Sequence, residues 1–439
     1  MREQWSRGGF LLAAVGSAAG LGNIWRFSYV AGENGGAAFL IIYMVAVIFI
    51  GLPLVIAELA IGRRGRDDAV ATLRHQAPGK HWYIAGGLSV VGAFFILGFY
   101  SLIAGWALKY FIGAVDGSLW APVHSSAYGA YFKAFIARPY EPLIWQLLMI
   151  AITTAVVAAG IRHGIEAANR LLMPILGLII IALAVYSLNL DGAEKGLEFL
   201  FSPDWSAFSR PAVYIAAIGQ AFFSLGIGMA IFLTYGSYLD PGQSIGKSAC
   251  IIVLGDSLLA ITAGLAIFPA VFAFGIDPAE GPELAFITLP GLFSQMPGGR
   301  FIGTLFFGLL AGAALTSMFS ILEVPSAYLA RRMAWSRRKA VCLAALLSFL
   351  AGLPPALGFA LLEDITINGR GLLDTYDYAV SHLLLPTGGI LIALFTGWGW
   401  GKSRALEASG LLNSPLGKVW LFSLRYISPV VILAVFMSA

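Results

Sequence analysis

The chain has 439 residues, of which 59% are hydrophobic and only 11% are charged, and its formal net charge is +4 at pH 7. Ordinary soluble domains carry roughly 25% charged residues, and a soluble chain of this size could not hide so much apolar surface. The composition therefore excludes most soluble classes and indicates an integral membrane protein, and the small net charge gives no sign of a nucleic-acid partner.

Apolar stretches long enough to span a membrane recur along the whole chain. A helix needs about 20 mostly apolar residues to cross the hydrocarbon core. In chain order, the stretches cover residues 8–30, 35–57, 82–108, 143–161, 171–190, 211–239, 248–276, 301–322, 340–362, 383–401 and 419–439. Three of them contain one embedded charge each, namely Arg26, Asp256 and Arg425. We therefore predict an all-α integral membrane protein with about eleven spans.

Basic residues gather in alternate loops. Most of the 27 Lys and Arg residues fall on the side of the N-terminus, whereas the opposite loops carry acids such as Asp191, Glu194 and Asp204. Since cytoplasmic loops are enriched in Lys and Arg, the pattern predicts a cytoplasmic N-terminus. An odd number of spans then places the C-terminus outside.

The first and sixth spans contain runs of residues that form helices poorly. Residues 16–23 read GSAAGLGN, and residues 224–230 read SLGIGMA. Small residues in membrane helices commonly serve only to let two helices pack closely. Here the runs fall in spans one and six, which are corresponding positions if spans 1–5 and 6–10 are inverted copies of one unit. Paired interruptions of this kind indicate the binding site of a transporter.

Several short motifs are more specific than hydropathy. They are REQW at 2–5, GSAAGLGNIWRF at 16–27, ENGG at 33–36, GQAFFSL at 219–225, TYGSY at 234–238, ALTS at 314–317 and WSR at 335–337. With these motifs, the chain resembles the neurotransmitter:sodium symporter family, in particular its bacterial amino-acid transporters, over nearly its whole length. The resemblance implies a fold of five plus five inverted repeats, sodium coupling and alternating access.

The resemblance also implies how the chain is organised. It predicts one transmembrane transporter domain over residues 1–439, with a first repeat at 8–190, a second at 211–401 and a last span at 415–439. It places the protein in a bacterial inner (cytoplasmic) membrane.

Two sodium sites built from oxygen ligands follow from the resemblance. The first consists of the carbonyl of Ala18 and the side chains of Asn23, Ser224 and Asp256, completed by the substrate carboxylate. The second consists of the carbonyls of Gly16, Ala19 and Ala313 and the hydroxyls of Thr316 and Ser317. A shared ligand lets sodium and substrate raise each other's affinity. Outside such a motif, the two hydroxyls would be expected to bond only to their own helix.

Asp256 lies midway along a span, where a carboxylate is costly and is a functional hypothesis by default. Chloride-dependent relatives carry asparagine at this position, so the fixed negative charge predicts chloride-independent transport. The neighbours that would otherwise hold chloride are Tyr43, Gln220 and Ser224. A structural ion pair is one alternative role. Proton coupling through Asp256 is another, although the intact hydroxyl pair favours sodium.

The resemblance places the substrate at the two interruptions. Its carboxylate would meet the amides near Leu21 and Gly22 and the hydroxyl of Tyr100, and its ammonium the carbonyls of Ala18 and Phe223 and the hydroxyl of Ser317. The walls of the side-chain pocket would be Ser17, Ile96, Ile103, Gly226, Met229, Ser320 and Ile321. None of these is ionisable, and a charged side chain would lose its hydration there without compensation. We therefore expect a neutral, hydrophobic or aromatic L-amino acid.

Gates are implied at both ends of the site. Arg26 and Asp377 match the family's extracellular pair, although such a pair could also be purely structural. Arg2, Trp5 and Tyr238 match the cytoplasmic gate. The expected acidic partner of Arg2 is missing, because residues 330–332 read ARR where relatives carry an aspartate, and Glu323 is the candidate replacement.

Two further features concern helix stability. Gly164 and Pro174 lie ten residues apart in span 5, a spacing that lets this span unwind in similar transporters, although an ordinary proline kink would suffice. Glu58 in span 2 is expected to bond the exposed backbone of span 6.

Other classes of function find little support. A channel would need a continuous polar pore, and an enzyme would need a nucleophile–base or metal constellation. The five histidines show no ligand spacing, at His75, His81, His124, His163 and His382. We expect no enzymatic activity, Na+ as the only cofactor with no chloride, a small amino acid and the lipid bilayer as partners, and a monomer or weak homo-oligomer.

Overall fold

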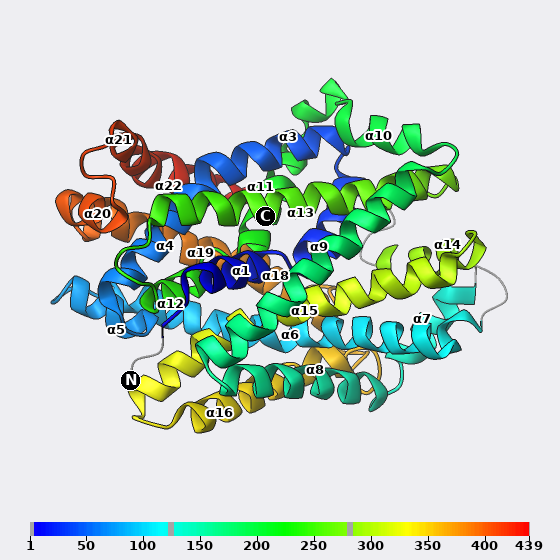
Figure 1. Cartoon of the computed structure of the whole chain (residues 1–439), viewed down its shortest axis with the longest axis horizontal. Coiled ribbons are helices and arrows are strands. Elements are labelled where there is room, and N and C mark those ends of the chain that lie inside the picture. Colours follow the sequence, from blue (N-terminus) through cyan, green and yellow to red (C-terminus); the bar gives the residue numbers. More distant parts are fainter. Residues whose placement is uncertain (1–3, 122–126, 279–283, 439) are drawn as a thin grey trace.

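The computed structural model describes residues 4–121, 127–278 and 284–438. The described part is almost entirely helical, with one isolated β-bridge between Ile367 and Arg370 and no strand. Figure 1 shows most of the long helices running side by side along the long axis of the molecule.

The helices that form the bundle are often divided by a wide π-turn or a break. They are α1 (Arg7–Ala18), α2 (Phe27–Glu33), α3 (Ala37–Ala46), α4 (Leu52–Gly65), α6 (Tyr83–Asp116), α8 (Glu141–Ala158), α9 (Ala167–Leu188), α11 (Pro211–Leu225), α12 (Ile231–Ser237), α13 (Ile245–Ala273), α15 (Gly299–Arg332), α16 (Arg337–Ala351), α17 (Leu353–Leu357), α18 (Leu372–Tyr378), α19 (Leu385–Leu394), α21 (Pro415–Phe422) and α22 (Ser428–Ser438). The π-turns are Gly22–Arg26, Val47–Gly51, Ile161–Glu166, Ala379–Leu384, Phe395–Gly399 and Ser423–Ile427.

Nine helices of the described part are long and apolar enough to cross a membrane, and the bent pair Gly8–Ala18 and Gly22–Glu33 makes up to ten. The shorter apolar helix Pro211–Leu225 occupies the position of the predicted sixth span. The predicted all-α membrane transporter fold is therefore confirmed. The predicted start of the tenth span at residue 383 is too late, because the helix begins at Leu372 and its first turns carry the acids Asp374 and Asp377.

Short helices mark the two ends of the bundle. They are α5 (Ala69–Gln76), α7 (Ala127–Ile136), α10 (Ala193–Phe201), α14 (Thr288–Gln295) and α20 (Lys402–Ser409). In Figure 1, α5 and α20 lie at the end nearest the N-terminus, whereas α7, α10 and α14 lie at the opposite end. We refer to these as the N-terminal end and the far end.

The helix α4 packs unusually closely against α12, because glycines line the contact. A Cβ at Gly62 would lie 1.9 Å from the carbonyl oxygen of Leu233, and a Cβ at Gly236 would lie 2.8 Å from that of Leu59. Real Cβ atoms do not approach so closely, so both positions require glycine. The two helices therefore meet backbone against backbone.

Candidate functional site

Both helix interruptions predicted from the sequence are present. α1 ends at Ala18, the chain passes through residues 19–21 into the π-turn, and the two halves are bent by 45°. The second interruption lies between α11 and α12, where Gly226, Gly228 and Ala230 have φ values of +64°, +86° and +56°. Left-handed backbone cannot continue an α-helix, so these three residues end α11 and free its backbone groups.

The interruption in the sixth span is held in place by Glu58. The amide of Gly228 donates to Oε1 of Glu58 at 3.0 Å, and this carboxylate is fully buried. A Cβ at Gly228 would lie 2.4 Å from the carbonyl oxygen of Leu385, so the loop also needs glycine to fit. The role predicted for Glu58 is confirmed by this hydrogen bond.

The carboxylate of Asp256 is the centre of a fully buried polar cluster. Asn23 Nδ2 donates to Oδ1 at 2.8 Å, and Ser224 Oγ donates to the same oxygen at 2.5 Å. Tyr43 donates to Oδ2 at 3.0 Å. The three side chains of the predicted first sodium site therefore meet at one point. Three donors to one carboxylate stabilise its ionised form, and a hard cation takes ligands of this oxygen type.

Gln220 connects this cluster to Arg26. Its Oε1 accepts from Arg26 Nη1 at 3.0 Å, and its Nε2 donates to the carbonyl of Gly22 at 2.7 Å. Of the three neighbours that could hold chloride, Tyr43 and Ser224 both donate to Asp256 and Gln220 is bound on both sides. These polar groups are therefore already engaged within the protein.

A second cluster joins the last turn of α1 to α15. Ser317 Oγ donates to the carbonyl of Ser17 at 3.0 Å, and Ser17 Oγ donates to Ser320 Oγ at 2.6 Å. Thr316 Oγ1 donates to the carbonyl of Ala313 in its own helix at 2.9 Å. A hydroxyl that donates one bond keeps lone pairs for a cation. Of the two hydroxyls of the predicted second sodium site, that of Ser317 therefore bonds to α1 and that of Thr316 bonds within α15.

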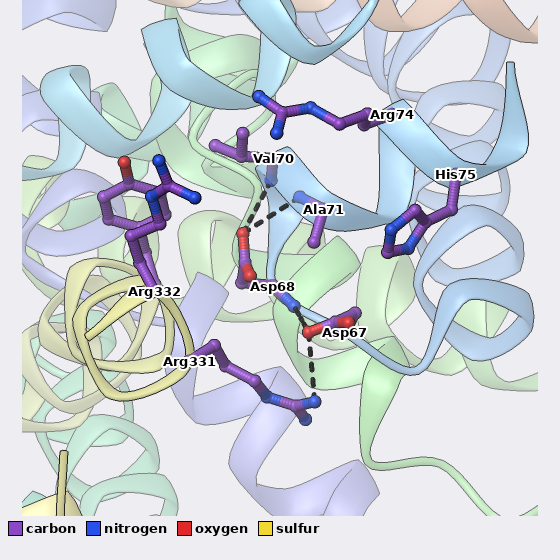
Figure 2. A pocket seen from close by; sticks show the side chains of 9 residues that line it. Asp67, Asp68, Val70, Ala71, Arg74, His75, Arg331 and Arg332 are labelled. Atoms are coloured by element: carbon purple, nitrogen blue, oxygen red, sulfur yellow. Dashed lines mark hydrogen bonds and ion pairs between the residues drawn. The ribbon is translucent and has the colours of Figure 1, made fainter. Parts of the chain in front are cut away.

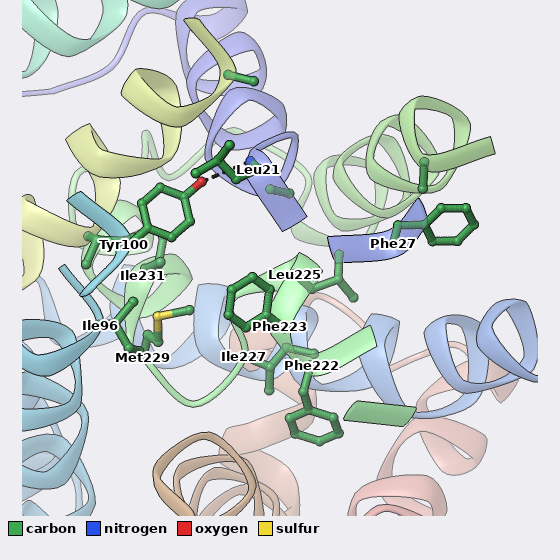
Figure 3. Packing of buried hydrophobic residues seen from close by; sticks show 14 of the residues in the cluster. Leu21, Phe27, Ile96, Tyr100, Phe222, Phe223, Leu225, Ile227, Met229 and Ile231 are labelled. Atoms are coloured by element: carbon green, nitrogen blue, oxygen red, sulfur yellow. Dashed lines mark hydrogen bonds between the residues drawn. The ribbon is translucent and has the colours of Figure 1, made fainter. Parts of the chain in front are cut away.

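A small cavity of about 20 Å³ lies where the two interruptions meet. Figure 3 shows the hydroxyl of Tyr100 against the backbone of Leu21, with Ile96, Met229 and Phe223 nearby. The Leu21 amide donates to that hydroxyl at 3.0 Å. The lining residues are Ser17, Ala18, Gly20, Gly22, Ile96, Tyr100, Phe223, Ser224, Gly226, Met229, Ile231, Ser317 and Ile321. None of them carries a formal charge.

Three predicted wall or binding residues do not line this cavity. Leu21 contributes only its amide, through Tyr100. Ile103 is buried in the apolar core, and the hydroxyl of Ser320 faces Ser17 and the carbonyl of Ser317. The amide of Leu21 was the group predicted, and the roles of all three residues stay predictions.

Gly20 and Ile231 line the cavity but were not predicted. Gly20 lies inside the glycine-rich run of span 1, and Ile231 is the first residue after the left-handed Ala230. Proximity to the interruptions was the signal that could have indicated both residues.

Arg26 and Asp377, the predicted outer pair, do not form an ion pair with each other in the described part of the chain. The guanidinium of Arg26 lies 4.6 Å from the centroid of the Phe223 ring and donates to Gln220. Asp377 Oδ1 instead accepts from Ser381 at 3.0 Å. The expected direct contact is replaced because an aromatic face and an amide oxygen bind the guanidinium.

Trp5 and Tyr238, two residues of the predicted cytoplasmic gate, are in contact, because the amide of Trp5 donates to the carbonyl of Tyr238 at 3.4 Å. Trp5 is only 6% exposed, and its Nε1 donates to the carbonyl of Tyr235 at 3.1 Å. Tyr238 donates to Glu323 Oε1 at 2.7 Å, and Arg337 Nη2 pairs with Glu323 Oε2 at 2.5 Å. The predicted gate residue Arg2 lies outside the described residues. Glu323, its proposed acceptor, is bound by Tyr238 and Arg337.

Arg331, which stands where relatives carry an acid, has an acidic partner from another loop. Its Nη1 pairs with Asp67 Oδ1 at 3.0 Å. Figure 2 shows this contact beside Asp68, whose carboxylate accepts from the amides of Val70 and Ala71 at the start of α5. The departure from the family pattern therefore creates a different ion pair, in a pocket on the surface of the N-terminal end.

Glu166 makes a further contact that the sequence reading missed. This carboxylate, 1% exposed, accepts from the amide and the hydroxyl of Ser6 at 2.9 and 2.5 Å, and pairs with Arg170 at 2.6 Å. Glu166 therefore connects Ser6, the residue just before α1, to the π-turn Ile161–Glu166, which contains Gly164. A Cβ at Gly164 would lie 1.9 Å from the carbonyl oxygen of Val156, so this turn requires glycine.

Known proteins are similar to this chain over nearly its whole length. The family model described as the sodium:neurotransmitter symporter family matches residues 2–128 and 139–439. An uncharacterized sodium-dependent transporter of Bacillus subtilis is 42% identical over 444 residues, covering 99% of this chain and 97% of that protein. An uncharacterized sodium-dependent transporter of Haemophilus influenzae is 34% identical over 448 residues, covering 100% and 98%.

A solved structure is also similar over the full length. The crystal structure of MhsT in complex with L-phenylalanine has a TM-score of 0.94 and 50% sequence identity, and covers 100% of both chains. The two chains therefore share their fold from end to end.

Proposed function

Because the chain belongs to the sodium:neurotransmitter symporter family, we propose that this multi-pass membrane transporter uses a sodium gradient to drive uptake of a neutral, hydrophobic or aromatic L-amino acid. The observation that carries the proposal is the cavity at the two helix interruptions. Its lining combines free backbone groups, a few hydroxyls and apolar side chains. It offers polar groups to the two ends of a zwitterion and apolar walls to a side chain.

The proposed pose places the charged ends of the substrate at the interruptions. Its carboxylate lies near Gly22 and Tyr100, and its ammonium lies near the carbonyls of Ala18 and Phe223 and the hydroxyl of Ser317. Ile96, Met229 and Ile321 then surround the side chain. Gly226 adds no side chain to the wall, and Met229 is flexible enough to move aside for an aromatic ring. The full-length similarity to MhsT, solved with L-phenylalanine, supports an aromatic substrate.

Two sodium ions are proposed to bind beside the substrate. The first would be held by Ala18, Asn23, Ser224 and Asp256 together with the substrate carboxylate, and the second by the carbonyls and hydroxyls around Gly16 and Thr316. When ion and substrate share a ligand, each raises the affinity for the other by the same factor. This reciprocity would couple the downhill entry of sodium to the uphill entry of the amino acid.

Transport is proposed to be independent of chloride. Asp256 supplies a fixed negative charge, and its three hydrogen-bond donors favour the ionised carboxylate. The hydroxyls of Thr316 and Ser317 argue against the alternative, proton coupling through Asp256, because they can serve as sodium ligands but do not titrate.

Several broader features complete the proposal. The protein would lie in a bacterial inner membrane, with the N-terminus in the cytoplasm and the C-terminus outside. Its two inverted repeats would be residues 8–190 and 211–401. We propose transport without enzymatic activity, by a monomer or a weak homo-oligomer.

Uptake into proteoliposomes tests this function. A radiolabelled mixture of neutral amino acids would be supplied under an inward sodium gradient, with potassium as the control and gluconate replacing chloride in a parallel set. We expect accumulation that requires sodium and ignores chloride, with L-phenylalanine among the accumulated substrates. Accumulation driven by a proton gradient but not by sodium would overturn the sodium proposal and favour proton coupling.

A further inference from the structure

A fully buried amide oxygen on span 5 has no partner in the described part of the protein. Asn169 lies near the start of α9, and its Nδ2 donates to the carbonyl of Ile165 at 2.9 Å. Only the NH2 group of the amide can donate to a carbonyl, so this bond fixes Oδ1 on the opposite side. Oδ1 accepts no hydrogen bond from any described residue. An isolated buried acceptor is costly, so its retention calls for a function.

This oxygen faces the last turn of α1. A Cβ at Gly16 would lie 2.2 Å from Asn169 Oδ1, so only glycine lets α1 approach span 5 this closely. On another side, Ser317 donates to the neighbouring carbonyl of Ser17. Residues 16 and 17 of α1 therefore contact both the amide oxygen of Asn169 on span 5 and the hydroxyl of Ser317 on span 8.

Polar side chains continue from Asn169 toward the N-terminal end of the bundle. Glu166 lies one turn earlier and is buried, and it accepts from Ser6 and pairs with Arg170. The side chain of Arg170 is 64% exposed. The unpartnered oxygen is thus the innermost of a series of polar groups that reaches the surface.

We propose that Oδ1 of Asn169 is a further ligand of the sodium ion at the second site, bound directly or through one water. Hard cations bind neutral amide and carbonyl oxygens, and Gly16, which this oxygen faces, belongs to the proposed ligand set. An amide does not titrate, so the residue can serve a metal cation but cannot carry a proton. The inference rests on the proposed sodium symport and adds to it a ligand on the side of the site nearest the N-terminal end.

Three substitutions separate the oxygen from the other roles of this residue. Asn169→Leu removes the oxygen and the donor at similar volume. Asn169→Asp also removes the donor to Ile165 but keeps the oxygens. The matched control is Asn189→Leu, because Asn189 ends the same helix and donates to the carbonyl of Val185 at 2.7 Å but is exposed.

The readout is the binding of radioactive sodium, and of L-phenylalanine as a function of sodium concentration, to the purified full-length protein. We expect Asn169→Leu to raise the half-saturating sodium concentration about tenfold, as for the loss of one charge-assisted contact. Asn169→Asp should stay at or below the wild-type value, and Asn189→Leu should match the wild type.

Two results would overturn the inference while leaving sodium symport intact. One is a half-saturating concentration within twofold of wild type in Asn169→Leu, and the other is an equal increase in Asn169→Leu and Asn169→Asp, which would assign the effect to the lost donor. If Asn169→Leu does not fold, Asn169→Ala takes its place in the same comparison. Absence of sodium binding in the wild type itself would instead overturn the proposed function and this inference together.

Discussion

We interpret two sets of predicted gate residues as covers of the central cavity, one toward each end of the bundle, and they use different interactions. At the N-terminal end, Tyr238 and Arg337 both bind the fully buried carboxylate of Glu323. At the far end, the guanidinium of Arg26 lies over Phe223 and makes one hydrogen bond to Gln220, without an ion pair to Asp377.

The difference indicates which cover opens more easily. Removing one partner of a buried ion pair strands a charge in a medium of low dielectric, whereas a cation over an aromatic ring contributes modestly. The cover at the N-terminal end is therefore the harder one to displace. The substrate would reach the cavity from the far end first, which suits a protein that loads outside and releases inside.

The largest effect is expected from Arg337→Ala, which leaves the carboxylate of Glu323 buried without its cation. We expect a cost of about 3–5 kcal/mol to the closed arrangement. The measurement is the labelling rate of Ser237→Cys, next to Tyr238, in a background where the exposed Cys250 and Cys342 are serine. Labelling should rise by at least a hundredfold.

The control for this substitution is its exposed neighbour, Arg338→Ala, which should leave labelling unchanged. Equal labelling in Arg337→Ala and the parent protein would show that the ion pair does not hold this end closed.

A smaller effect in the same direction is expected from Tyr238→Phe. The substitution removes one hydrogen bond to a charged group and keeps the ring, at a cost of about 1.5–3 kcal/mol. Labelling at position 237 should rise about tenfold to a hundredfold. A rise larger than that of Arg337→Ala would assign the closure to the tyrosine rather than to the ion pair.

At the far end, Arg26→Gln should have a weaker effect, because it removes a cation–π contact of about 0.5–2 kcal/mol. Bound L-phenylalanine should dissociate from the purified protein roughly threefold to tenfold faster. Arg300→Gln, at an exposed arginine that begins α15 near the same end, serves as the control. Slower dissociation in Arg26→Gln would contradict a covering role for this side chain.

The smallest effect is expected from Arg331→Ala. Its ion pair with Asp67 joins side chains that are 35% and 27% exposed, and pairs of this kind contribute about 0–1 kcal/mol and weaken with salt. Labelling at position 237 should change less than about fivefold, and high salt should abolish the difference. A change as large as that of Tyr238→Phe would make this surface pair part of the closure.

The sequence predicted best those features that the backbone itself imposes. Gly226 and Gly228 mark the second interruption by their residue type alone, and eight of the cavity-lining residues lie within residues 16–23 and 223–230, which contain the breaks. Glu58 was predictable for the same reason, because unwound backbone in a membrane needs a partner.

Side-chain partners distant in the chain were less predictable. The pairings of Ser6 with Glu166 and of Asp67 with Arg331 depend on how loops from different spans pack, and neither residue of each pair indicates the other. Arg26 was expected to pair with Asp377, but an aromatic face and an amide compete for its guanidinium at similar free energy. Hydropathy also misplaced the start of the tenth span, because Asp374 and Asp377 reduce the apolar character of a helix that is nevertheless continuous.

The backbone contact between α4 and α12 bears on how motion in this protein could be measured. No side chain fits between Gly62 and Leu233 or between Gly236 and Leu59, so we expect the two helices to move as one unit. Fluorophores on the outward faces of these two helices would keep a constant separation through the transport cycle. The constant separation of this pair would be a reference distance. The displacement of any third labelled helix could be measured against it.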